Sequence, residues 1–223
     1  MTTVAAVAKN GAVYMAADSC TNVYERPIVG GATKILRLTP EILLGVSGYA
    51  GLIGLYAADL PGALPPPPGE EEDPQPWAHK VATVASQLAV TVGLVENGRL
   101  DGSLLLGRAG RVWTLVHATA IPHADGVAAI GSGEGPAIGA LDALLARKVN
   151  PLAAVREAVQ IACSRDRYSE PPIQAETLSA FRPGGQVNAP IHVTINSGPG
   201  GGFGATSAAA MVAVERHRRR QAQ

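Results

Sequence analysis

Three residues near the start of the chain, Thr2, Asp18 and Lys34, are of the types that acyl-transfer chemistry uses. If Met1 is removed, as expected when the next residue is small, Thr2 carries a hydroxyl and a free α-amine. Such an amine has an ordinary pKa of about 7.7 to 8.0, so at neutral pH a useful fraction can accept the proton of the hydroxyl. Thr2 then supplies a nucleophile and its base together.

A terminal nucleophile of this kind needs a carboxylate to orient its partners, a cation near the amine and backbone donors for the developing oxyanion. Asp18 follows the second apolar run, Lys34 opens the third, and Gly48 follows the fourth, where the lack of a side chain lets its N–H approach a substrate. Each residue also has a simpler interpretation. Thr2 is then an ordinary start residue, Asp18 a turn residue, and Lys34 a charge that protects an edge strand.

A β-hairpin is the element that would bring Asp18 to the terminus. Apolar runs at residues 3–7 and 12–17 flank Asn10-Gly11, which favours a type I′ turn because both central residues need a positive φ. Residues 34–38 and 42–47 predict a second strand pair across Thr39-Pro40-Glu41. A glycine-rich corner, 48–51, follows this pair and is typical of a functional loop.

The remaining pattern predicts an α+β protein with two antiparallel sheets packed face to face and helices outside, a four-layer αββα sandwich. Helices are expected over 52–60, 77–95, 134–148 and 152–165, and strands over 103–107, 112–117, 126–130, 177–181 and 191–196. Residues 61–76, PGALPPPPGEEEDPQP, predict an exposed insertion with polyproline character. We expect one domain over 2–197, followed by a glycine-rich hinge and an Ala/Arg-rich tail over 198–223.

Six short motifs, TTVAAV, AADS, TKIL, VSGYAG, IGSGEG and DRYS, resemble the proteasome β-subunit family of N-terminal nucleophile (Ntn) hydrolases. The resemblance extends over about residues 2–196 apart from the insertion. It implies that Thr2 is the nucleophile, Asp18 and Lys34 its charged partners and Gly48 the oxyanion donor. It also implies site roles for three further residues, Ser132, Asp166 and Ser169.

The residues themselves leave other interpretations of these three positions open. Ser132 lies between two glycines and is also typical of a loop serine that satisfies local backbone. Asp166 and Ser169 lie where a helical pattern ends, and a surface ion pair of Asp166 with Arg165 or Arg167 is the simpler alternative.

The resemblance implies a threonine-type endopeptidase that hydrolyses polypeptides through an acyl ester on Thr2. The family further implies a homo-oligomeric, self-compartmentalising ring, with an unfolding ATPase or cap as a partner. The start at Met-Thr resembles bacterial proteasome-like proteases without a propeptide. By analogy, small neutral residues line the pocket beside the nucleophile and predict an apolar residue before the cleaved bond: Thr21, Ala32, Val46 and Ala50.

Two other functions stay open: an Ntn amidase or transamidase acting on small amides, and an inactive ring subunit retained for assembly. The intact charged partners of Thr2 argue against the inactive subunit.

The composition narrows the partners of the chain. Eighteen basic and eighteen acidic residues cancel, so no global field favours nucleic acid or an anionic membrane. No apolar run reaches the length of about 18 residues that spans a membrane, and the start lacks signal-peptide character, which predicts a cytoplasmic protein. The two cysteines and five histidines lack metal-ligand spacing, and the glycine-rich segment 198–207 lacks the lysine of a phosphate-binding loop. We therefore expect no metal and no cofactor.

Overall fold

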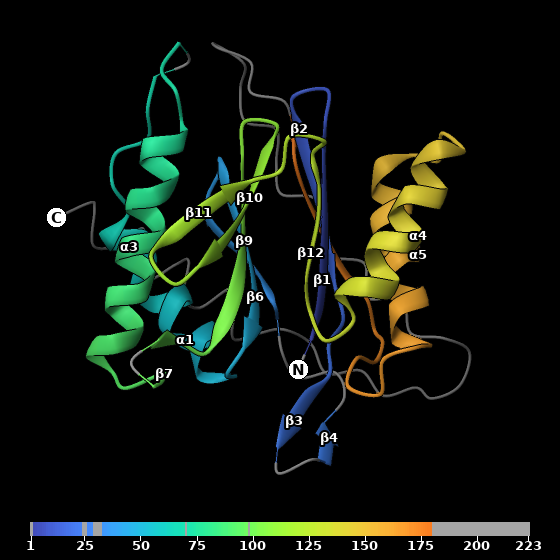
Figure 1. Ribbon diagram of the computed structural model, residues 1–223, viewed down its shortest axis with the longest axis horizontal. Coiled ribbons are helices and arrows are strands. Elements are labelled where there is room, and N and C mark those ends of the chain that lie inside the picture. Colours follow the sequence, from blue (N-terminus) through green and yellow to red (C-terminus); the bar gives the residue numbers. More distant parts are fainter. Residues whose placement is uncertain (1, 24–25, 29–32, 70, 98, 180–223) are drawn as a thin grey trace, which may run out of the picture.

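Two antiparallel sheets lie face to face, and helices cover the outer face of each (Figure 1). The structure is a computed structural model that describes residues 2–23, 26–28, 33–69, 71–97 and 99–179. The layers follow the order helices, sheet, sheet, helices, so the predicted αββα sandwich is confirmed. The predicted closing strand at 191–196 and the tail over 198–223 lie outside the described residues.

The first sheet holds the N-terminal hairpin at its centre, with the strand order β12-β1-β2-β13. Asn10 and Gly11 have φ values of 53° and 75°, as a type I′ turn requires, and the predicted hairpin is confirmed. The strands of this first sheet are β1 (Thr3–Lys9), β2 (Ala12–Ala17), β12 (Val127–Gly131) and β13 (Gln174–Leu178).

The second sheet has the strand order β11-β10-β9-β6-β5 and contains the predicted strand pair at 34–38 and 42–47 and the strands predicted at 103–107 and 112–117. Its strands are β5 (Ile35–Thr39), β6 (Ile42–Gly48), β9 (Gly102–Arg108), β10 (Arg111–Val116) and β11 (Thr119–Pro122). Sequence analysis missed β11 and two small hairpins, because strands of two to four residues carry little alternation. These hairpins are β3 (Thr21–Val23) with β4 (Arg26–Ile28), and β7 (Val95–Glu96) with β8 (Arg99–Leu100).

Each sheet has its own helical cover. Helices α4 (Glu134–Ala146) and α5 (Pro151–Cys163) pack on the first sheet, and the Asn150 side chain caps α5 by accepting from the Leu152 amide. Helices α1 (Gly51–Ala58), α2 (Leu60–Ala63) and α3 (Gln75–Thr91) pack on the second sheet.

Strand β1 is buried on both faces. Val4 and Ala6 point into the core between the sheets, whereas Ala5 and Val7 pack against the helical layer of α4 and α5. This double burial explains why the run after Thr2 is continuously apolar rather than alternating. The residue that precedes β1 is therefore attached to one of the most firmly held strands of the fold.

Several predicted boundaries are wrong, including that of the strand expected over 177–181, which is β13 (Gln174–Leu178). Helix α2 occupies the start of the proline-rich segment and α3 begins at Gln75, because proline is tolerated in the first turn, where its missing N–H is not needed. Helix α3 ends at Thr91 rather than at Val95, which pairs in β7, and Gly93 has a φ of 74° at the exit. The proline-rich segment also packs locally, since the Trp77 indole donates to the Pro65 carbonyl at 3.1 Å.

Candidate active site

Thr2 lies immediately before β1 and is 4% exposed. The next residue, Thr3, pairs with Gly131 of β12, and Gly131 has a φ of 96°. A Cβ atom on Gly131 would overlap the Thr2 carbonyl and lie 3.0 Å from the Ser47 hydroxyl. The bare glycine therefore lets β12 pass directly beside the candidate nucleophile.

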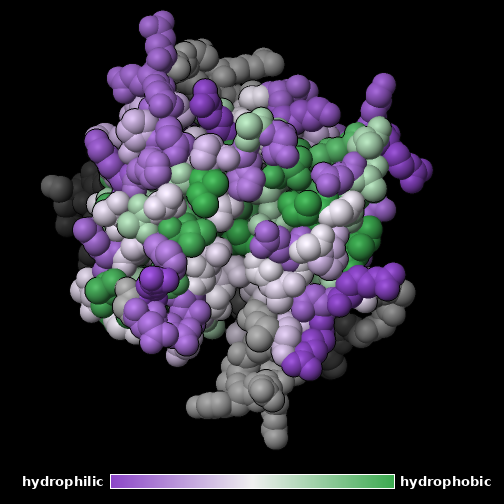
Figure 2. Space-filling view, in the orientation of Figure 1, coloured by the Kyte–Doolittle hydropathy of each residue, from purple (hydrophilic) through white to green (hydrophobic). Residues whose placement is uncertain are grey.

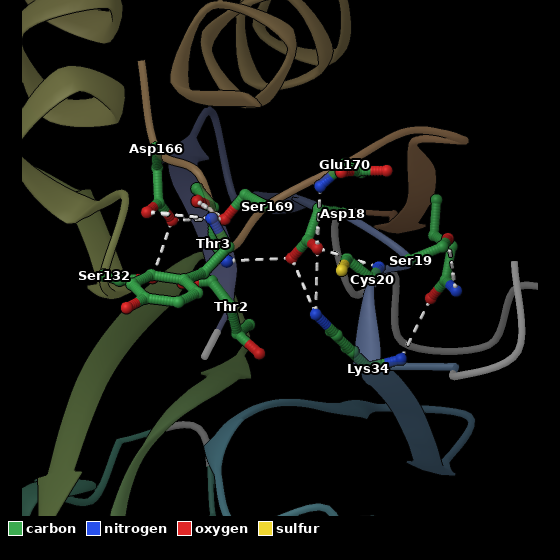
Figure 3. Close-up of polar contacts among 12 residues, drawn as sticks. Thr2, Thr3, Asp18, Ser19, Cys20, Lys34, Ser132, Asp166, Ser169 and Glu170 are labelled. Carbon is green, nitrogen blue, oxygen red and sulfur yellow. Dashed lines mark hydrogen bonds and ion pairs between the residues drawn. The ribbon is translucent and has the colours of Figure 1, made fainter. Parts of the chain in front are cut away.

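Asp18 and Lys34 form a buried ion pair beside this terminus (Figure 3). The Lys34 ammonium donates to both carboxylate oxygens, at 2.8 and 2.9 Å, and the two side chains are only 3% and 0% exposed. The Asp18 carboxylate also accepts from the backbone N–H of Thr3 at 2.8 Å. The pair is thus tied to the residue that directly follows Thr2.

The local turn also uses Asp18. Its second oxygen accepts from the Cys20 amide at 2.9 Å and from the Glu170 amide at 3.3 Å. Asp18 therefore caps the turn, as its simpler interpretation predicts, and forms the ion pair at the same time. An edge-protecting role for Lys34 does not fit, because its side chain is buried rather than solvated.

Ser132, Asp166 and Ser169 converge on the other side of the terminus (Figure 3). Both serine hydroxyls donate to the same oxygen of Asp166 at 2.6 Å. The Ser132 hydroxyl also lies 3.5 Å from the Thr2 carbonyl oxygen. The structure brings these three residues together through side-chain hydrogen bonds, and the surface ion pair considered for Asp166 is not among the ion pairs of the described residues.

Thr3 is a residue that sequence analysis missed. Its side chain is fully buried, and its hydroxyl lies 2.7 Å from the Ser169 hydroxyl. Because Ser169 gives its single hydroxyl proton to Asp166, the Thr3 hydroxyl is the donor in this contact. Thr3 therefore joins both polar groups, through its amide on Asp18 and its hydroxyl on Ser169. The only sequence feature that could have indicated this role for Thr3 is the Thr-Thr pair at the start of the chain.

Gly48 ends β6 with a φ of 120°, and a Cβ atom there would overlap the backbone of Asp101 and Gly102 in the neighbouring chain segment.

The residues predicted to line the substrate pocket differ in how far they are buried. Thr21 is half-buried, Ala50 is exposed, and Val46 is buried in the core beneath α1 and α3, whereas Ala32 lies outside the described residues.

The cysteines are free thiols, and the structure disfavours them as nucleophiles. Burial, followed by the negative charge of Asp18, raises the pKa of the Cys20 thiol. Burial raises the pKa of Cys163 to about 12. Since the thiolate is the reactive form, both residues are held in the unreactive state at neutral pH.

The fold agrees with several solved structures. The chain is 23% identical to eukaryotic HslV from Trypanosoma brucei over 78% of this chain and 98% of that chain, with a TM-score of 0.60. It is 22% identical to Thiobacillus denitrificans BPH over 80% of this chain and 98% of that one, with a TM-score of 0.68. The chain has the Ntn hydrolase fold.

The same BPH in complex with Epoxomicin matches this Ntn fold with a TM-score of 0.66, at 22% identity over 81% of this chain and 100% of that chain. A comparison of the sequence with protein-family models finds no match, and neither does a comparison with curated proteins. The predicted resemblance to proteasome β subunits is therefore confirmed as a likeness of fold.

Two features are absent from the described part of the chain. No helix there has the length and apolar character needed to cross a membrane. No group of three or more His, Cys, Asp or Glu side chains in these same ranges is arranged to hold a metal ion.

Proposed function

We propose that this chain is an N-terminal threonine peptidase that hydrolyses peptide bonds through an acyl ester on Thr2. One observation carries the proposal: the buried Asp18–Lys34 pair is attached by a 2.8 Å hydrogen bond to the amide of Thr3, next to the candidate nucleophile. Burying two charges is costly, and a pair that served only stability could be replaced by apolar side chains at little loss. A function at Thr2 accounts for its retention.

In the proposed reaction the Thr2 hydroxyl oxygen attacks the carbonyl carbon of the substrate, and the Thr2 amine accepts the hydroxyl proton. The Gly48 N–H stabilises the developing oxyanion. The C–N bond then breaks, the leaving amine takes the proton back from the Thr2 ammonium, and the acyl group remains on the oxygen. Water attacks this ester with the amine again as base, which releases the acid and restores the hydroxyl.

The two polar groups have distinct tasks in this mechanism. The positive charge of Lys34 favours the neutral, proton-accepting form of the Thr2 amine, and Asp18 holds that charge in place. Ser132 and Ser169 both donate to Asp166, and Ser169 accepts from the Thr3 hydroxyl, so this group holds the side chain of the residue next to Thr2 and helps to fix the orientation of the terminus. A free amine requires removal of Met1.

The substrate test compares an unfolded protein with small amides, using protein whose intact mass shows the loss of Met1. We expect fragments of the unfolded protein, no turnover of small amides, and faster cleavage of fluorogenic peptides that carry an apolar residue before the scissile bond. Turnover of small amides alone would support the amidase or transamidase alternative. A panel that favours Arg or Asp would contradict the pocket prediction.

We further propose that the chain works as a homo-oligomeric ring, as the resemblance to proteasome β subunits implies, and that an unfolding ATPase or cap delivers polypeptide to this ring. Several large apolar side chains are exposed and are available for subunit contacts. Figure 2 shows hydrophobic surface across the middle of one face, between hydrophilic margins. The exposed set is Tyr49, Val90, Val92, Ile121 and Ile161. The cytoplasmic location stays a prediction.

Mass photometry at working concentration tests the ring. We expect particles of several times the 22.8 kDa chain mass, because a chambered peptidase needs closed symmetry to enclose its sites. Substitution of the exposed Ile121 by Lys in the same experiment tests whether this side chain lies in a subunit contact, in which case the particle mass should fall. Particles of 22.8 kDa alone would contradict the ring while leaving the chemistry of Thr2 to its own test.

A further inference from the structure

Gln174, the first residue of β13, connects the two chain segments that carry Asp18 and Lys34. Its side-chain oxygen accepts from the backbone N–H of Lys34 at 2.9 Å. Its side-chain nitrogen donates to the hydroxyl of Ser19 at 3.0 Å, and Ser19 directly follows Asp18. One carboxamide therefore bridges the backbone of Lys34 and the neighbour of Asp18.

The direction of these hydrogen bonds requires an amide. The Ser19 hydroxyl gives its single proton to the Pro172 carbonyl at 2.6 Å, so its oxygen can only accept from Gln174. The Lys34 N–H can only donate. A side chain at position 174 must therefore present one donor and one acceptor at once, which glutamine does and glutamate or methionine does not.

This bridge matters because the lysine side chain is long and flexible. The position of its charge is fixed only when both the backbone and the ammonium are held. The ammonium end is held by Asp18. The backbone end is held by Gln174 at its N–H, and by the Val46 amide, which donates to the Lys34 carbonyl at 2.9 Å. Since β13 belongs to the first sheet and Lys34 precedes β5 of the second, the Gln174 contact also fixes one sheet against the other at the site.

We propose that Gln174 is a positioning residue that sets the Lys34 ammonium against Asp18 and the Thr2 amine. The inference rests on the proposed function for its effect on catalysis, whereas the placement of Lys34 can be measured independently of any activity.

The fold supplies a matched control two residues along the same strand. Glu176 also reaches from β13 to β5, where its carboxylate lies 2.8 Å from the Arg37 guanidinium. Both side chains of that pair are partly exposed, at 23% and 38%, and neither contacts the Asp18–Lys34 pair. Glu176→Gln thus weakens a contact between the same two strands without touching the site.

The first measurement is the acylation rate of Lys34 by an amine-reactive ester, read by peptide mass spectrometry. The chain has four lysines, and Lys9, Lys80 and Lys148 serve as internal references. We expect Gln174→Met to raise the relative rate at Lys34 about tenfold or more, because the backbone end of Lys34 loses its hydrogen bond and the ammonium then leaves Asp18 for solvent more often. Glu176→Gln should leave all four rates unchanged.

The second measurement is the pH dependence of peptide hydrolysis. In Gln174→Met we expect kcat to fall about tenfold to a hundredfold with little change in KM, and the acid limb of the profile to move to higher pH. Gln174→Glu should move that limb further, because its negative charge favours the protonated amine. If Gln174→Met fails to give a cooperative melting transition, Gln174→Glu, which preserves the side-chain size, decides the same two measurements.

Unchanged Lys34 acylation in a folded Gln174 variant would overturn the proposal, and so would a lower kcat with an unmoved pH profile. An inactive wild-type enzyme would instead contradict the proposed function. In that case the acylation rates alone decide whether Gln174 positions Lys34.

Discussion

Thr2→Ala is expected to abolish both peptide hydrolysis and covalent labelling by a hydroxyl-trapping inhibitor, with a loss of at least about a thousandfold in kcat, because the reacting oxygen is removed. Alanine, like threonine, is small enough to allow removal of Met1. The variant therefore keeps the free amine and loses the hydroxyl. The neighbouring hydroxyls are no substitute, since those of Ser132 and Ser169 are donated to Asp166. Intact mass after incubation with that inhibitor reports the labelling directly.

Thr2→Ser is the matched control for this experiment. It keeps a hydroxyl and an amine on the same residue and should retain labelling at a reduced rate. Circular dichroism and thermal melting should be unchanged in both variants, because β1 and its hydrogen bonds begin at Thr3. Labelling that persists in Thr2→Ala would place the nucleophile elsewhere and refute the proposed mechanism.

Asp18→Asn is expected to lower the free energy of unfolding by about 3 to 5 kcal/mol and to remove activity. The substitution leaves the buried Lys34 ammonium without its countercharge, and breaking one side of a buried pair costs more than the pair contributes. Denaturant titration measures the stability, and fluorogenic peptide cleavage measures the activity.

The double variant Asp18→Asn/Lys34→Met separates the two effects. Removal of both charges should recover much of the lost stability without any recovery of activity, because the double variant lacks the Lys34 cation as well as the carboxylate. Glu176→Gln breaks a partly exposed ion pair and should change stability by no more than about 1 kcal/mol. A loss in Asp18→Asn as small as that of Glu176→Gln would show that Lys34 is not confined as the structure indicates.

The elements of this protein were predictable where local chemistry decides them. Asn10-Gly11 demands a turn with two positive φ angles, and that turn sets the register in which Val4 faces Ala17. Asp18, one residue further, must then lie beside Thr3, so this half of the site follows from a stretch of fewer than twenty residues. The order of strand and helix patterns likewise predicted the αββα layers.

The rest of the site depended on contacts between distant segments. Lys34 reaches Asp18 only because the two sheets pack, and Ser132, Asp166 and Ser169 were identified from family resemblance rather than from their own pattern. No periodicity reveals that the Thr3 hydroxyl donates to Ser169, or that Gln174 bridges Lys34 and Ser19. Hydrogen bonds of this kind join residues up to 166 positions apart, and side-chain direction at such range is set by packing and not by local propensity.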